Sequence, residues 1–177
     1  MMMEAIDLNN TAQSLSQSGR HQDALKLFQE ALRLKIKACG THSKQAALSY
    51  NALGECYMEL HQYDLARTNL EAALAFRQTE GETLDTRVTR ENLGRVCEEM
   101  GDLHGAREHR NNGTNLCANN TCMDEPPENG LRLFSCSRCK AIYYCCKDCQ
   151  KEDWKRHKVY CKVLSAGITT NDEQVNC

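Results

Sequence analysis

A run of cysteines between Cys136 and Cys161 holds the side chains whose types and spacing suit metal chemistry. The run reads CSRCKAIYYCCKDCQKEDWKRHKVYC. Close pairs of cysteine or histidine grip a tetrahedral metal, because a short turn lets two side chains reach one ion. Thiolate and imidazole together suit zinc, whereas magnesium and calcium need oxygen ligands. The spacing yields these candidate ligands: Cys136, Cys139, Cys145, Cys149, His157 and Cys161.

Six ligands do not fill two tetrahedral sites, so the chain must supply two more. Cys117 and Cys122 lie just upstream of the run. Eight ligands then make two closed sites. A closed site with four protein ligands is structural, because a catalytic zinc keeps an open position for water. We therefore expect two structural Zn²⁺ ions per chain.

The run resembles a MYND-type zinc finger over about a quarter of the chain. The C-x2-C, C-x3-C and H-x3-C spacings match, as do Tyr144-Cys145 and the Cys-Gln-x3-Trp from Cys149 to Trp154. In that family the two sites interleave along the sequence. The resemblance implies one zinc on Cys117, Cys122, Cys145 and Cys149, and the other on Cys136, Cys139, His157 and Cys161.

Two features depart from the family pattern. The first pair, Cys117 and Cys122, is spaced C-x4-C where the family usually has C-x2-C. Cys146 stands beside Cys145 and competes with it as a ligand. The spacing to Cys149 favours Cys145.

Residues 1–113 carry only helix signals, with no alternating strand pattern. Gly19 to Leu32 (GRHQDALKLFQEAL) aligns with Leu60 to Leu74 (LHQYDLARTNLEAAL) at an offset of 42 residues. A third copy begins at Gly101, about 40 residues further on. Self-similarity at such a period indicates stacked helical hairpins.

The aligned copies resemble tetratricopeptide repeats of the longer kinesin-light-chain type. Small residues at matching positions let two helices cross closely, and Gly40 and Gly81 fit the left-handed position that ends a helix. The third copy has Arg110 and Gly113 where apolar and alanine residues belong, which fits a polar end cap.

In such repeats the first helix of each copy lines a concave face. The alternative is that the side chains at these positions simply face water. The matching positions are Asn9, Gln13, Asn51, Glu55, Glu91 and Arg95.

We therefore expect a mainly α protein in three parts. A tetratricopeptide-like helical-repeat domain spans 1–113, a small two-zinc MYND finger spans 117–161, and a disordered tail spans 162–177. The finger has a short β-hairpin, with Leu131 to Phe134 pairing with Ile142 to Tyr144. A finger of this size cannot fold without metal, whereas the repeats need none.

MYND fingers are known for binding short proline-rich peptides of the Pro-x-Leu type. The implied mode is strand addition to the hairpin, with pockets that recognise side chains. Matching residue by residue implicates Ser137, Gln150 and Trp154. A helix expected over Asp148 to Val159 places Gln150 and Trp154 on one face. The alternative is that Trp154 is a core residue.

The composition of the chain bears on where in the cell we expect it. The chain has 177 residues and a formal charge of −2. No stretch approaches the ~20 apolar residues of a membrane span, and no signal-like run opens the sequence. Twelve cysteines in a reducing compartment argue for metal rather than disulfides. We expect an intracellular protein, nuclear or cytoplasmic, with no membrane partner.

The finger is basic, with nine Lys or Arg against three acidic residues from Leu131 to Val163. Such an excess invites a nucleic-acid interpretation. Thiolates on zinc offset half of it, and nearby cations favour thiolate over thiol. The repeat half has 13 basic and 16 acidic residues. Direct nucleic-acid binding is therefore not expected.

No catalytic set is visible, so we do not expect an enzyme. Some MYND fingers belong to SET-domain lysine methyltransferases, and the 16 residues after Cys161 leave no room for that fold. The leading interpretation is a zinc-binding protein-interaction adaptor, with repeats and finger each docking a partner and the finger binding a proline-rich peptide. The alternatives are a ubiquitin-ligase-like zinc protein, although RING sites end in C-x2-C, and a nucleic-acid-associated transcriptional regulator.

Overall fold

Helices dominate the computed structural model, which describes residues 1–81, 83–111, 116–119, 121–122 and 133–166. No helix within these ranges is long and apolar enough to cross a membrane. The elements are α1 (Met2–Gln17), α2 (His21–Cys39), α3 (Lys44–Glu59), α4 (Tyr63–Arg77), the 3₁₀ helix η1 (Gln78–Glu80), α5 (Leu84–Glu99), α6 (Leu103–Asn111), β1 (Phe134–Ser135), β2 (Tyr143–Tyr144) and α7 (Lys147–Ala166).

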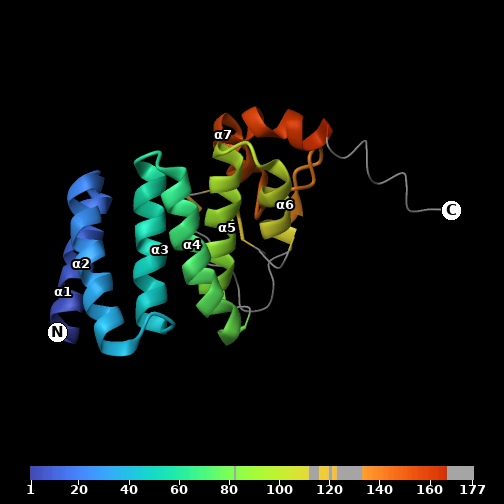
Figure 1. Ribbon diagram of the computed structural model, residues 1–177. Helices are drawn as coiled ribbons and strands as arrows, with labels where there is room; N and C mark the ends of the chain where they lie inside the picture. Colours follow the sequence, from blue (N-terminus) through green and yellow to red (C-terminus); the bar gives the residue numbers. More distant parts are fainter. Residues whose placement is uncertain (82, 112–115, 120, 123–132, 167–177) are drawn as a thin grey trace.

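The first six helices form three pairs, α1–α2, α3–α4 and α5–α6, which stand side by side in chain order (Figure 1). The predicted helical-repeat architecture is thereby confirmed. Gly40 and Gly81 end the first two pairs with φ of 85° and 90°, in the left-handed region where glycine has no steric penalty. The side chains of Ser43 and Thr83 then accept from backbone amides and cap the helices that follow.

Close helix crossings depend on small residues, as predicted. A Cβ placed on Gly54 of α3 would lie 2.5 Å from Leu70 Cγ of α4. The matching Gly94 of α5 faces Arg110 of α6, and a Cβ there would lie 3.1 Å from the guanidinium. Side chains from all three pairs then build one apolar core: Ala12, Ala24, Phe28, Leu53, Cys56, Tyr57, Ala66, Leu70, Leu74, Leu93 and Val96.

A buried cation links the first helix pair to the second. Lys35 at the end of α2 is 5% exposed, and its Nζ donates to Asn9 Oδ1 at 3.0 Å and to Ser49 Oγ at 2.7 Å. Burial lowers the pKa of this ammonium. Neutral oxygens from α1 and α3 therefore hold the charge.

The same contact recurs between the second pair and the third. Arg77 of α4 donates from Nη1 to Asn51 Oδ1 at 3.0 Å and also bonds Thr89 Oγ1. The side chains of Asn9 and Asn51 therefore both form hydrogen bonds between helices. The expectation that these two asparagines line an open concave face, or simply face water, is wrong.

At the third pair a buried ion cluster replaces the apolar contact. Arg110 occupies the position of Leu70, yet its side chain is 1% exposed. Its guanidinium donates to Glu91 at 2.9 and 3.1 Å and to Glu98 at 2.7 Å. The sequence predicts a polar end cap here; Arg110 is polar, but it is buried and does not end the packed structure. The second cap residue, Gly113, lies outside the described residues.

The finger covers this cluster, because α7 lies across the ends of α5 and α6 (Figure 1). Arg156 of α7 donates to Glu98 at 2.6 Å and to Asp153 at 2.7 and 2.9 Å. The hydroxyl of Tyr144 in β2 donates to Asp153 at 2.7 Å. We call the set Glu91, Glu98, Arg110, Asp153 and Arg156 the junction.

Two further hydrogen bonds border the junction. Arg95 of α5 donates to the carbonyl of Ala118 at 2.9 Å, and Tyr160 of α7 donates to Glu99 at 2.8 Å. Arg110 and Arg95 hold the pKa of Glu91 below its usual range, although burial opposes them. Repeats and finger are thus joined by buried charge.

Helix α7 continues to Ala166, beyond Lys162 where we expected a tail to begin. The rest of that predicted tail, 167–177, lies outside the described residues.

Candidate metal centre

The hairpin and α7 bring Cys136, Cys139, His157 and Cys161 together, all of them buried. Cys136 and Cys139 lie in the turn after β1, which is closed by a bond from the Lys140 amide to the Cys136 carbonyl at 2.9 Å. His157 and Cys161 are one helical turn apart on α7. The Sγ atoms of Cys136 and Cys161 are 3.8 Å apart, and Cys139 Sγ lies 3.5 Å from His157 Nε2.

A second group unites Cys117, Cys122, Cys145 and Cys149. Cys145 follows β2, and Cys149 lies in the first turn of α7. Sγ of Cys145 lies 3.6 Å from that of Cys122 and 3.4 Å from that of Cys149. The resemblance implied this same division of the eight side chains.

The unusual C-x4-C spacing is accommodated by a turn of its own. The Cys122 amide donates to the Asn119 carbonyl at 3.1 Å. The Asn119 side chain donates to Glu152 of α7 at 2.7 Å and accepts from Thr121 at 3.0 Å. The Ala118 amide donates to the Tyr143 carbonyl at 2.9 Å, which fixes the segment beside the hairpin.

Both groups have the size and chemistry of a zinc site. A tetrahedron with Zn–S bonds of ~2.3 Å has ligand–ligand edges of about 3.8 Å. The ligand atoms within each group lie within 4.8 Å of one another, and the shortest contacts are 3.4 to 3.8 Å. The finger is therefore suited to bind zinc at two sites.

Burial shifts the protonation of several ligand groups in the two sites. Burial raises the pKa of Cys139 to about 12 and that of Cys117 to about 11. Burial lowers the pKa of His157, which keeps its imidazole neutral and able to coordinate. A metal must therefore displace thiol protons that the protein alone retains.

Cys146, the competitor to Cys145, stands outside both groups. Its Sγ accepts a hydrogen bond from the Cys149 amide at 3.4 Å. This contact lies at the start of α7, where a backbone amide lacks an intrahelical partner. The structure thus gives Cys146 a capping contact.

The predicted peptide-binding residues are only partly brought together. Gln150 and Trp154 line a pocket of about 250 Å³ on α7, whereas Ser137 is exposed in the first metal turn and does not line it. Trp154 is 40% exposed, so the alternative that it is a core residue does not hold. Sequence reasoning missed Lys151, which completes the pocket lining.

Models of known protein families match both the repeats and the finger. The MYND finger model matches residues 117–161, and tetratricopeptide-repeat models match residues 8–43 and 45–111. The matched ranges fall within the helical repeats and the finger described above.

Curated relatives match short segments. A SET and MYND domain-containing protein of Dictyostelium discoideum is 49% identical over 47 residues, which is 27% of this chain and 9% of that protein. Egl nine homolog 1 of Homo sapiens is 53% identical over 30 residues, 17% of this chain and 7% of that protein. The chain thus spans less than a tenth of the length of these two relatives.

Solved structures resemble the repeats. BtubC (BKLC) from P. vanneervenii is 29% identical with a TM-score of 0.58, over 75% of this chain and 54% of that chain. A putative kinesin light chain of Podosopora anserina with nearly identical TPR-like repeats is 14% identical with a TM-score of 0.60, over 93% of this chain and 76% of that chain. The second likeness concerns the fold alone.

Proposed function

We propose that this chain, which joins tetratricopeptide repeats to a MYND finger, is a protein-interaction adaptor rather than an enzyme. The finger holds two Zn²⁺ ions and docks a proline-rich peptide, and the repeats dock a second partner. The thiolate sites need reduced cysteines, so we place the protein inside the cell.

The observation that carries this proposal is the exposed face of α7. Trp154 and Gln150 line an open pocket there, while Arg156 and Tyr160 of the same helix donate to Glu98 and Glu99 of the repeats. Attachment to the repeats therefore leaves the pocket accessible. The indole offers an apolar wall for a proline or leucine of a bound peptide.

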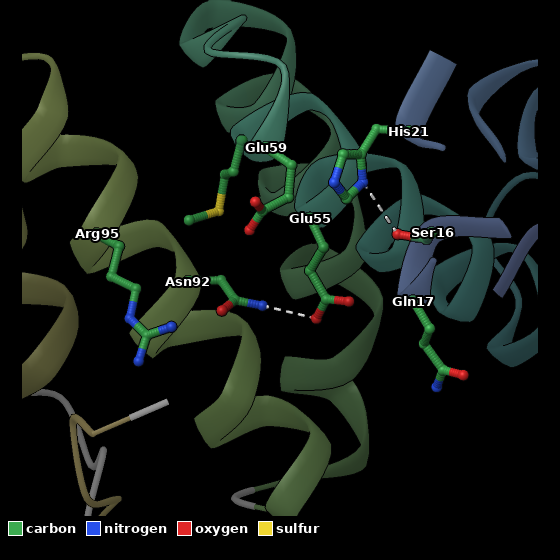
Figure 2. A pocket seen from close by; sticks show the side chains of 8 residues that line it. Ser16, Gln17, His21, Glu55, Glu59, Asn92 and Arg95 are labelled. Carbon is green, nitrogen blue, oxygen red and sulfur yellow. Dashed lines mark hydrogen bonds between the residues drawn. The ribbon is translucent and has the colours of Figure 1, made fainter. Parts of the chain in front are cut away.

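The repeats offer a second surface in a pocket of about 340 Å³ lined by α1, α3, α5 and the start of α2 (Figure 2). Figure 2 shows Glu55 of α3 and Asn92 of α5 meeting at its wall, and the amide donates to the carboxylate at 2.9 Å. Arg95 lines the same pocket. Of the predicted concave positions, Glu55 and Arg95 therefore do line a hollow, whereas Glu91 is buried in the junction.

Zinc stoichiometry tests the metal assignment. Metal analysis of the purified chain should give two zinc ions per chain. Cys145→Ser should lose one of them, because an open site with an unbalanced charge binds weakly. Cys146→Ser is the matched control and should keep both. The reverse pattern would move the ligand from Cys145 to Cys146.

Truncation of the indole tests the peptide site. Buried interface tryptophans often cost about 2 kcal/mol or more, on the order of thirtyfold in affinity. Trp154→Ala should therefore weaken binding of a proline- and leucine-rich peptide by about that factor in a calorimetric titration, while both zinc ions remain. Val159→Ala, exposed on the same helix but outside the pocket, is the control and should bind as wild type. Unchanged affinity of a zinc-loaded Trp154→Ala protein would place the groove elsewhere.

A further inference from the structure

A stripe of lysines follows the outer face of α7. Lysines recur there every three or four residues, which places them on one side of a helix. All five are exposed. We call the following set the lysine stripe: Lys147, Lys151, Lys155, Lys158 and Lys162.

The lysine stripe makes few ion pairs with the rest of the protein. Lys151 pairs with Asp148 at 3.1 Å, but both side chains are more than three quarters exposed, so the pair is weak. The other four make no ion pair with any described part of the chain. The junction uses Arg156 from the same helix, on its opposite side. The stripe is therefore open to a partner of opposite charge.

The stripe is continuous with the peptide pocket. Lys151 lines that pocket together with Gln150 and Trp154, and Lys155 follows Trp154 directly. A chain that places an apolar side chain against Trp154 thus passes along the lysines.

The order of residues around α7 disfavours a membrane surface. Interfacial helices bury a continuous apolar face and keep lysine on the opposite, polar face. Here the lysines occupy the middle of the exposed face, with Trp154 on one flank and Val159 and Val163 on the other. The apolar groups are separated by charge.

Charge around the finger disfavours a long nucleic-acid strand. The repeats carry 16 acidic against 13 basic residues in 1–113, and Glu99 lies beside α7, where Tyr160 donates to it. A polyanion that extended beyond α7 would meet like charge, which is destabilising. A short acidic segment fits within the stripe alone.

We infer that the lysine stripe recognises an acidic peptide segment that flanks the apolar residues bound at Trp154. This inference rests on the proposed function and specifies the partner: a proline- and leucine-containing core with aspartate or glutamate beside it. Carboxylates spaced along the segment pair with successive lysines. The indole supplies apolar contact, and the stripe selects for charge.

The test compares two peptides with the same Pro-Leu core, one flanked by aspartate and glutamate and the other by serine and glutamine. Each is titrated by fluorescence polarisation against the zinc-loaded full chain at low and physiological ionic strength. The acidic peptide should bind about tenfold more tightly, as several exposed pairs of a few tenths of a kcal/mol each would give, and added salt should shrink the difference.

Lys155→Gln/Lys158→Gln/Lys162→Gln, which leaves the pocket lining intact, should remove that tenfold advantage and leave the neutral peptide unaffected. Lys26→Gln/Lys37→Gln/Lys44→Gln removes the same charge from exposed lysines of the repeats and should change neither peptide. Thermal melts and zinc content of both triple variants verify folding.

Equal binding of the two peptides to wild type overturns this inference, while Trp154-dependent binding of the neutral peptide still supports the proposed function. Failure of both peptides to bind overturns the proposed function and this inference with it. A duplex DNA or anionic vesicle that binds through the stripe more tightly than the acidic peptide also overturns the assignment.

Discussion

The second helix pair and the third, which carries the finger, fill one equivalent packing position in two different ways. At equivalent positions of α4 and α6, Leu70 packs against Gly54 and Arg110 packs against Gly94. Leu70 contributes to an apolar core, whereas Arg110 is enclosed by carboxylates. The difference reflects the neighbour: α4 meets another helix pair, and α6 meets a zinc finger.

Buried charge makes the second solution selective. An apolar contact tolerates many partners of similar shape, whereas a buried arginine needs carboxylates in fixed places. Glu98 accepts from Arg110 of the repeats and from Arg156 of the finger. We therefore expect the junction to favour one arrangement of the two modules.

Metal removal should give the largest effect and tests the comparison directly. Without zinc the finger should unfold, because we expect metal binding to supply its folding free energy. Glu98 then loses Arg156, so amide exchange in α5 and α6 should rise at least tenfold, while α1 to α3 stay protected. Hydrogen exchange with and without chelator measures this. Uniform protection across all six helices would uphold the expectation from sequence that the repeats need no metal.

Removing the central cation should come next. Arg110→Met leaves Glu91 and Glu98 buried without their main partner, which costs about 3–5 kcal/mol. Chemical denaturation measures the loss. Arg33→Met breaks the exposed pair with Glu30 and is the control, with no measurable change expected. A cost for Arg110→Met no greater than for Arg33→Met would show that the junction charges are not coupled.

The smallest effect should distinguish the two glycines. Gly54→Ala forces a Cβ to within 2.5 Å of Leu70 in the core, and overpacking of this kind costs about 1–3 kcal/mol. Gly94→Ala meets the guanidinium end of Arg110 at 3.1 Å, where a small shift relieves the contact. Melting temperatures of the two variants rank the costs, and a larger loss for Gly94→Ala would reveal a junction more rigid than the apolar core.

The metal groups and the repeats were predictable because their signals are local or periodic. His157 and Cys161 are one helical turn apart, and the glycines and alanines recur at a constant offset. The roles of Asn9 and Asn51 were missed although a signal existed. Lys35 and Arg77, their buried partners, repeat at the same 42-residue offset.

The junction was not predictable, because its partners are far apart in sequence. In the sequence, Arg110 departs from the repeat pattern, and no neighbouring residue indicates that its side chain is buried. Its carboxylate Glu98 lies 12 residues away, and Arg156 reaches Glu98 from 58 residues away. Only the fold, with α7 packed over α5 and α6, shows that Arg110 makes a buried contact where the repeat pattern has an apolar residue.

A rigid junction also sets the geometry of any bivalent partner. We expect the buried charges of the junction to hold the pocket near Glu55 and the pocket at Trp154 at one separation. A partner that carries both recognition segments on one chain gains avidity only if its linker spans that separation. Too short a linker engages one pocket alone, and a much longer one dilutes the second encounter.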